Sequence, residues 1–312
     1  MKALAWIEPS DLQGALAAAA EPGTLVKAGG VDVGDRLKEH LDEPQALVNI
    51  RNLRELDFVR AERDALVFGP LVTLARLAAD DRVPRALAEA ALQAATPQIR
   101  AMATLGGNLA QRPRCWYFRR EDFHCRKKGG ETCFAHDGEN EEHAVFDNQV
   151  CAIVHPSATA TALVALGATL KLKSAKAERS MPAGEFFSHA DVLRENVLER
   201  GELIVEVRVP ITKAPSAYIK LMEKQSFDWP LAEAAVWLGP QPRIVLGAAA
   251  AVPLRAPKAE QAIAGKRIDQ ALAAQAAKLA VQGATPLSKN GHKVLLLEVA
   301  VRRALLAAGG AA

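Results

Sequence analysis

The chain has 312 residues, of which 50% are hydrophobic and 24% charged, and its formal net charge is +3 at pH 7. This length predicts two domains, and the composition excludes disordered, collagen-like and coiled-coil proteins. The longest apolar run, residues 244–254, is far shorter than the roughly 20 residues of a membrane span, so we expect a soluble chain with no membrane span. So small a positive charge argues against a general nucleic-acid binder. Glu8, Pro9 and Asp11 interrupt the first apolar residues, so no signal peptide is expected.

The first hundred residues alternate strand-like and helical patterns. Residues 23–30, 45–53 and 64–70 resemble strands, and residues 71–80 and 85–95 follow a helical period. The second helix is expected to end before Pro97, because the residue ahead of a proline resists the helical conformation. This alternation predicts an α/β region.

Residues 112–150 interrupt this pattern with charged, glycine, histidine and aromatic residues. A loop of this length is uncommon unless it has a function. After it we expect a helix that Ser157 could cap, then a strand, and a second strand over residues 202–210, where apolar residues alternate.

The last hundred residues predict a different architecture. Strand-like runs at residues 217–224, 231–239 and 243–252 precede two alanine-rich helical stretches at residues 258–283 and 291–308. Strands followed by helices indicate an α+β domain, and the boundary is placed near residues 211–215.

Two glycine loops are candidate phosphate-binding elements. In "VKAGGVDVG", at residues 26–34, Gly29 and Gly30 follow a predicted strand. Paired glycines permit positive φ and close backbone approach, so successive N–H groups can converge on an anion, although each loop alone is equally an ordinary turn. Two such loops could hold two phosphates of one dinucleotide, but neither fits G-x-G-x-x-G, so a Rossmann nicotinamide site is not predicted. The second loop, "ATLGGNLA", contains Thr104, Gly106, Gly107 and Asn108.

All four cysteines lie within 37 residues and are spaced C-x9-C-x7-C-x17-C. Structural zinc sites usually contain close cysteine pairs, which are absent here, whereas iron–sulfur clusters occur with several spacings. The many arginines and lysines nearby would favour thiolates. An iron–sulfur cluster is therefore favoured, with zinc and free thiols as alternatives and disulfides as a minor one. The four are Cys115, Cys125, Cys133 and Cys151.

Three other features stay open. Four histidines near the cysteines could be zinc or Rieske ligands and are left unassigned: His124, His136, His143 and His155. The aromatic residues 116–118 could stack on bases, but the acidic residues of positions 131–142 favour apolar cover for a buried cluster instead. Tyr218 and Lys220 could face a flavin ring, or could be the buried and exposed faces of a strand. No hydrolase or NTPase motif is present.

Over nearly its whole length the chain resembles the FAD-binding medium subunit of the molybdenum hydroxylases, the xanthine dehydrogenase and aldehyde oxidoreductase group. The motifs are "KAGGVDV", "QIRAMATLGGNLA", "ELIVEVRVP" and "YIKLMEKQSFDWPLAEAAV". The resemblance implies an FAD-binding domain of two α/β subdomains at residues 1–212 and a smaller α+β domain, an antiparallel sheet with helices, at residues 213–312. The implied FAD-binding residues are Val26, Lys27, Ala28, Gly29, Gly30, Val31, Asp32, Val33, Thr104, Gly106, Gly107, Asn108 and Lys220.

Within this set, the resemblance implies that the four glycines admit the pyrophosphate, that Thr104 and Asn108 form hydrogen bonds near it, and that Lys220 lies towards the flavin ring. Two positions depart from the family pattern. Ala158 replaces a frequent aspartate, and Ala101 replaces the usual asparagine, so backbone N–H groups are expected to do most of the phosphate binding.

The cysteine-containing insertion, at about residues 112–151, resembles that of the flavoprotein of bacterial periplasmic aldehyde oxidoreductase and, more distantly, that of 4-hydroxybenzoyl-CoA reductase. The resemblance implies a 4Fe-4S cluster with Cys115, Cys125, Cys133 and Cys151 as ligands.

The family further implies an electron-transfer subunit without catalytic residues of its own. A large subunit with a molybdenum cofactor would oxidise an aldehyde or related substrate, a small subunit with 2Fe-2S clusters would relay electrons, and FAD would pass them to an external acceptor. The alternatives are a self-sufficient flavoprotein oxidoreductase and a zinc-stabilised nucleic-acid module. We expect assembly in the cytoplasm, or export to the periplasm with a partner that carries a twin-arginine signal.

Overall fold

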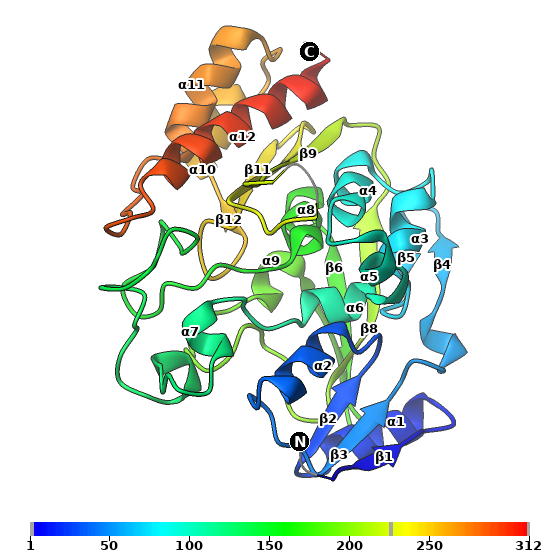
Figure 1. Cartoon of the computed structure of the whole chain (residues 1–312). Coiled ribbons are helices and arrows are strands. Elements are labelled where there is room, and N and C mark those ends of the chain that lie inside the picture. Colours follow the sequence, from blue (N-terminus) through cyan, green and yellow to red (C-terminus); the bar gives the residue numbers. More distant parts are fainter. Residues whose placement is uncertain (1–2, 225–226, 311–312) are drawn as a thin grey trace.

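The computed structural model of the chain describes residues 3–224 and 227–310. Within these ranges the strands form three sheets of three, five and four strands. Figure 1 shows the three-stranded sheet at one end of the molecule and the C-terminal helices at the other, with the five-stranded sheet between them. No helix in the described part of the chain has the length and apolar character needed to cross a membrane.

The three-stranded sheet is parallel, in the order β1-β3-β2. Parallel neighbours need crossover connections, which the helices α1 and α2 provide. Asp11 caps α1 by accepting a hydrogen bond from the Gly14 N–H at 2.7 Å. The first glycine loop is the turn between β2 and α2. The elements are β1 (Ala5–Ile7), α1 (Leu12–Ala20), β2 (Thr24–Lys27), α2 (Val31–Lys38) and β3 (Ala46–Asn49).

The five-stranded sheet is antiparallel, in the order β4-β5-β8-β6-β7. Its longest strand, β8 (Leu203–Pro210), is the predicted period-two strand, and it pairs with β5 so that Val209 lies opposite Leu66. The other strands are β4 (Val59–Ala61), β5 (Ala65–Phe68), β6 (Thr169–Lys173) and β7 (Glu178–Pro182). The helices of this region are α3 (Leu74–Ala79), α4 (Arg85–Leu92), α5 (Pro97–Met102), α6 (Leu105–Leu109), α8 (Ala158–Leu166) and α9 (Ala183–Phe186), with a 3-10 turn at Arg54–Leu56.

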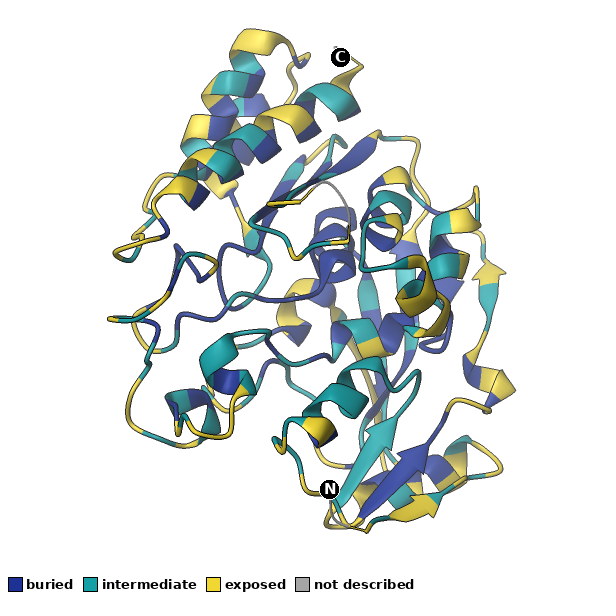
Figure 2. Ribbon diagram, viewed as in Figure 1, coloured by how far each residue is buried: buried dark blue, intermediate teal, exposed yellow. Residues whose placement is uncertain are grey.

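The C-terminal sheet is antiparallel, in the order β12-β11-β10-β9. Helices α10 to α12 cover one face, and α4 and α8 of the preceding region contact the same strands from the other side. Helix α8 is buried at all nine of its residues, as Figure 2 shows, because apolar elements surround it. The elements are β9 (Ser216–Leu221), β10 (Ala232–Trp237), β11 (Arg243–Gly247), β12 (Leu254–Arg255), α10 (Pro257–Ile263), α11 (Gln270–Ala280) and α12 (His292–Gly309).

One predicted helical stretch, residues 258–283, is two helices in the structure, α10 and α11. Gly265 between them has φ +69°, which ends a helix, and Asp269 caps α11 by accepting a hydrogen bond from the Leu272 N–H at 2.7 Å. Residues on both sides of Gly265 follow a helical pattern, so the sequence predicted one continuous stretch.

The cysteine-containing segment has little regular structure, namely the short helix α7 (Trp116–Arg119) and a 3-10 turn at Arg126–Lys128. It is tied down instead by hydrogen bonds to distant residues. The Val145 N–H donates to the Ala249 carbonyl at 2.9 Å, and the Asn290 side chain donates to the carbonyl of His143 at 3.0 Å. Lys127 donates to the carbonyl of Val192 at 2.8 Å. The segment is thereby attached to both halves of the chain.

Candidate functional site

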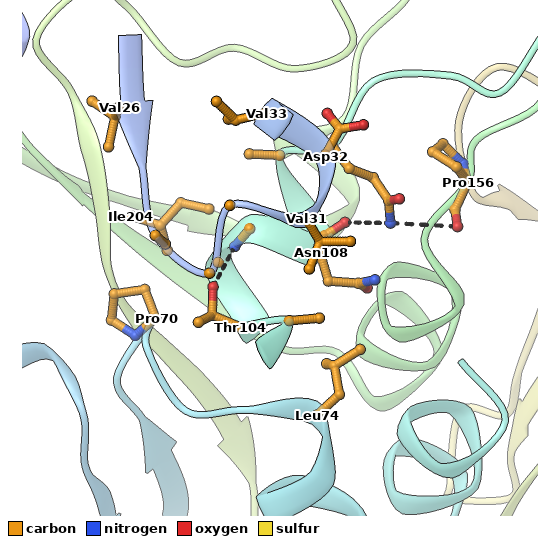
Figure 3. A pocket seen from close by; sticks show the side chains of 18 of the residues that line it. Val26, Val31, Asp32, Val33, Pro70, Leu74, Thr104, Asn108, Pro156 and Ile204 are labelled. Carbon is orange, nitrogen blue, oxygen red and sulfur yellow. Dashed lines mark hydrogen bonds between the residues drawn. The ribbon is translucent and has the colours of Figure 1, made fainter. Parts of the chain in front are cut away.

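A cavity of about 520 Å³, here called the main cavity, lies between the two glycine loops, residues 198–204 at the start of β8, and residues 227–233 of the C-terminal part. Figure 3 shows Val31, Asp32, Thr104 and Asn108 around it. Its volume falls within the range of about 300 to 1,000 Å³ that small-molecule and cofactor sites occupy. The two predicted loops are therefore brought to one site.

The first glycine loop offers free backbone donors to the main cavity. Gly30 has φ +80° and forms the N-terminal cap of α2. A Cβ atom on Gly29 would lie 2.0 Å from the Met102 carbonyl oxygen, so only glycine lets the loop pack against the chain that leads into the second loop. The N–H groups of residues 29–33 donate to no other described residue. Consecutive free amides at a helix N-terminus favour an anionic ligand.

The second glycine loop contributes shape rather than free amides. The Leu105 and Gly106 N–H groups donate to carbonyls of Val72 and Pro70, both at 2.8 Å. Thr104 caps α6, and its Oγ1 accepts a hydrogen bond from the Gly107 N–H at 3.2 Å. Since these donors are already satisfied, this loop serves mainly to let the backbone approach a ligand closely.

Asn108 is held by two hydroxyl groups from the start of α8. Its Oδ1 accepts hydrogen bonds from Ser157 Oγ and Thr159 Oγ1, both at 2.6 Å. This orients the side-chain amide and leaves its Nδ2 without a partner in the described part of the chain. Ala158 lines the cavity between these two residues and adds no polar group, whereas Ala101 does not line it.

Asp32 lines the main cavity, but its carboxylate is engaged by the cysteine-containing segment. Its Oδ1 is 3.0 Å from Arg114 Nη2 and 2.7 Å from Arg119 Nη2, and Oδ2 accepts a hydrogen bond from the Arg112 N–H at 3.1 Å. Burial alone would raise the pKa of Asp32, but the two arginines outweigh it and hold this pKa below its usual value. The sequence predicted Asp32 as a residue of the FAD-binding loop but not its arginine partners, which lie 80 residues or more away in the chain.

Lys220 and Tyr218 share the buried face of β9, because residues two apart on a strand point to the same side. The alternative of one buried and one exposed residue is therefore wrong. Lys220 Nζ donates to the carbonyls of Gln93 at 3.0 Å and Asp228 at 2.6 Å, and burial lowers its pKa. Of the motif that follows, residues 225 and 226 lie outside the described part of the chain.

Glu233 is a cavity residue that sequence reasoning missed. It is 1% exposed on β10, and Thr161 Oγ1 donates to its Oε2 at 3.2 Å. Burial raises its pKa. The only available signal was an acidic residue within the apolar run "LAEAAVW".

All four cysteines line one small hollow, here called the cysteine hollow, together with Lys127 and the apolar side chains of Phe118, Phe134 and Ile153. None forms a disulfide, and Cys125 is buried. The carboxylate of Glu195 lies 2.7 Å from Lys127 Nζ. In the described ranges no three histidine, cysteine or acidic side chains are arranged as a site for a single metal ion.

The thiols of the hollow differ in pKa. A hydrogen bond between Cys133 and Cys151 lowers the pKa of Cys133 and raises that of Cys151, whereas burial raises the pKa of Cys115 to about 12. His143 Nε2 lies 3.2 Å from Cys115 Sγ, and its ring packs edge-on against Trp116. The other three histidines, His124, His136 and His155, do not line the hollow.

The basic residues around the cysteines are mostly paired within the chain. Arg112 and Lys127 both bind Glu195, Arg120 binds Asp122 at 2.7 Å, and Arg126 donates to the Glu131 carbonyl at 2.6 Å. Because of these contacts, the basic side chains bind other groups of the same chain and do not form a free docking surface.

Comparison with known proteins places this architecture in a family. Residues 2–212 match the family described as the FAD binding domain in molybdopterin dehydrogenase, and residues 217–308 match the CO dehydrogenase flavoprotein C-terminal domain. The chain therefore belongs to the family of FAD-binding subunits of molybdenum hydroxylases, which are oxidoreductases. This confirms the predicted family and the predicted mixed architecture, with an antiparallel C-terminal sheet and helices.

Particular relatives are similar over most of the chain. The aldehyde oxidoreductase FAD-binding subunit PaoB of Escherichia coli (strain K12) is 32% identical over 254 residues, which cover 78% of this chain and 80% of PaoB. The structure of quinoline 2-oxidoreductase from Pseudomonas putida 86 covers 100% of this chain and 99% of its own, with a TM-score of 0.78 and 26% identity. Carbon monoxide dehydrogenase from Hydrogenophaga pseudoflava matches with a TM-score of 0.78 and 25% identity, covering 99% of this chain and 98% of its own.

Proposed function

We propose that the chain binds FAD in the main cavity and transfers electrons within a molybdenum hydroxylase of several subunits. The observation that carries this proposal is the pair of glycine loops facing one cavity, with five consecutive free N–H groups at residues 29–33. Bound FAD would supply the redox chemistry, and the protein would set its position and electrostatic surroundings.

The main cavity suggests a division of roles along its length. The amides of the first glycine loop would bind the diphosphate, while Gly106 and Gly107 admit it closely and Asn108 Nδ2 donates to it. Lys220 and Glu233 line the cavity in the C-terminal half of the chain, where they would surround the flavin ring. Lys220 is held in place there by its two carbonyl acceptors.

We further propose that Cys115, Cys125, Cys133 and Cys151 hold a 4Fe-4S cluster. The support is that all four thiols line one hollow under apolar cover, beside the buried ammonium group of Lys127. A cluster of four irons is larger than one ion, so its ligands surround a space instead of meeting at a point. A nearby positive charge favours thiolates over thiols.

The expected partners follow from the family. A small 2Fe-2S subunit and a large subunit with a molybdenum cofactor would deliver electrons from an aldehyde or related substrate, and FAD would pass them to an external acceptor. PaoB, itself a subunit of an aldehyde oxidoreductase, supports that substrate class. Substrate oxidation would occur on the partner, after assembly in the cytoplasm and with export to the periplasm if the partner carries a twin-arginine signal.

FAD binding is tested by comparing Gly107→Asp with Gly107→Asn. The two side chains have nearly the same size, but only aspartate places a negative charge beside the phosphates. We expect Gly107→Asp to purify with little or no flavin and Gly107→Asn to retain much more, measured as flavin per chain. Equal flavin content in wild type and both variants would contradict this placement.

The cluster is tested by iron and acid-labile sulfide analysis of anaerobically purified protein. About four of each per chain is expected for a Cys₄ cluster, and Cys125→Ser should lower both. A chain that holds zinc, or no metal, would contradict the cluster, and zinc with salt-dependent DNA or RNA binding would favour the nucleic-acid alternative. Flavin reduction by substrate in the isolated chain would favour a self-sufficient oxidoreductase.

A further inference from the structure

The two proposed cofactor sites are connected by polar contacts that converge on Asp32. This residue lies in the first turn of α2, directly after the first glycine loop, and its side chain is only 11% exposed. Three groups of the cysteine-containing segment converge on its carboxylate: the guanidinium groups of Arg114 and Arg119 and the N–H of Arg112. Such charge-assisted hydrogen bonds are among the strongest polar contacts in proteins.

The arginines are fixed to the cysteine side by covalent and hydrogen-bonded links. Arg114 directly precedes Cys115, and Cys115 is the N-terminal cap of α7, whose last residue is Arg119. The Arg119 N–H donates to the Cys115 carbonyl at 2.9 Å, and its guanidinium also binds the carbonyl of Pro113 at 2.7 Å. A displacement of Cys115 would therefore displace both arginines.

Arg114, one of the partners of Asp32, also lies between the two sites. A second small hollow lies between them: it shares Cys115 and His143 with the cysteine hollow, and Arg114 and Trp229 with the main cavity. The Arg114 guanidinium lies 5.0 Å from the centroid of the Trp229 ring. Arg114 thus lines the main cavity and at the same time borders a cysteine of the hollow.

We propose that Asp32 is a positioning residue through which the occupancy of the cysteine hollow sets the affinity of the first glycine loop for FAD. With the cluster bound, Cys115 holds the arginines, the arginines hold Asp32, and the free amides of residues 29–33 keep the arrangement that binds a diphosphate. Without the cluster, this constraint is released. By linkage, FAD must then stabilise the cluster by the same factor. The inference rests on the proposed function.

The test measures the dissociation constant of FAD for the 312-residue chain, by quenching of flavin fluorescence, with iron bound and after anaerobic removal by a chelator. We expect iron removal to weaken FAD binding by about tenfold or more in the wild type. In Asp32→Asn, FAD binding should be weak in both forms and change less than about twofold on iron removal. Asp32→Glu keeps the carboxylate and should retain part of the effect.

The matched control is Asp57→Asn. Asp57 forms an ion pair with Arg76 at 2.9 Å, and neither of these two residues lines the main cavity or belongs to the cysteine-containing segment. This variant should behave as the wild type does. A reciprocal measurement on wild-type protein alone, the rate of iron loss to the chelator with and without FAD, should show slower loss with FAD, and it decides the coupling even if Asp32→Asn fails to fold.

The outcomes separate this inference from the proposed function. Wild-type protein that binds both groups but shows the same FAD affinity with and without iron overturns the inference and leaves the proposed function standing. An equal effect of iron removal in wild type and Asp32→Asn overturns the role of Asp32. Wild-type protein without iron or without flavin overturns the proposed function, and the inference falls with it.

Discussion

At the scale of single residues, the main cavity contains an acid in an environment that disfavours its charge. Glu233 is completely buried between β10 and α8, with Thr161 as its hydrogen-bond donor. Burial raises its pKa, although Lys220 nearby acts in the opposite direction. A glutamate at such a position costs stability when it is ionised, which suggests that it is retained for the cavity rather than for the fold.

We therefore predict a pH-dependent effect of Glu233→Gln on stability. The pKa of Glu233 is higher in the folded protein than in the unfolded chain. The acid therefore lowers the free energy of unfolding least at pH values below its pKa in the unfolded chain. Stability is lost as the pH rises from there through the pKa of the folded protein. Glutamine mimics the protonated acid at every pH, and Lys220 keeps its carbonyl acceptors. As the pH rises above 4.5, the ordinary pKa of a glutamate, the variant should gain on the order of 1 kcal/mol over the wild type.

Thermal unfolding at several pH values checks this prediction. The control is Glu178→Gln on β7, an exposed acid paired with Lys171 at 3.2 Å, whose effect should be small and nearly independent of pH. A constant difference between Glu233→Gln and the wild type across these pH values would show that the acid is not neutralised by burial.

At the scale of elements, local sequence signals located most of the regular structure but not the contacts between elements. Ser157 was predicted to cap a helix, and it does so by accepting a hydrogen bond from the Ala160 N–H at 3.1 Å. Both glycine loops were likewise predicted from local residue types. The packing of Gly29 against Met102 was not predictable, because it joins segments more than 70 residues apart. The arginine partners of Asp32 were missed for the same reason.

Helix caps near the main cavity should affect both stability and FAD binding. Thr104→Ala removes the hydroxyl that accepts the Gly107 N–H, and Thr73→Ala removes the equivalent cap of α3, where Oγ1 accepts the Arg76 N–H at 3.3 Å. Each change should cost about 1 kcal/mol. Only Thr104→Ala should also weaken FAD binding, because Thr73 does not line the cavity.

Urea unfolding and flavin titration of both variants distinguish these effects. Thr104→Ser keeps the hydroxyl and should restore most of the stability and the affinity. Equal flavin affinity in Thr104→Ala and Thr73→Ala would mean that the second glycine loop does not depend on its cap for binding.

At the scale of the whole molecule, the two halves of the chain share one apolar core. Tyr218, Ala235 and Val245 of the C-terminal sheet pack in the same buried cluster as Phe68 and helices α4 and α8. The link is also polar, since the Tyr218 N–H donates to Glu89 Oε2 at 2.8 Å. The change of pattern near residues 211–215 indicated a boundary, but no local signal showed that strands beyond it complete the core before it.

We therefore predict that the halves do not fold independently. Residues 213–312 expressed alone would expose the sheet face that α4 and α8 cover, and should aggregate or bind a hydrophobic dye. In contrast, a protease site inserted at Lys213 and cleaved in the folded protein should leave both fragments associated on size-exclusion chromatography. A stable, dye-free fragment of residues 213–312 would contradict a shared core.

The many ties of the cysteine-containing segment have a consequence for limited proteolysis. Its basic residues would be obvious trypsin targets in a flexible loop, yet Lys127 is buried, and the Arg126 and Lys128 side chains are bound to backbone carbonyls. A protease must draw out several residues of extended chain to cut, and near residues 126–128 this would break the hydrogen bonds of these side chains to backbone carbonyls. This long insertion should therefore resist digestion like a structured domain, and removal of the proposed cluster should expose it to nicking.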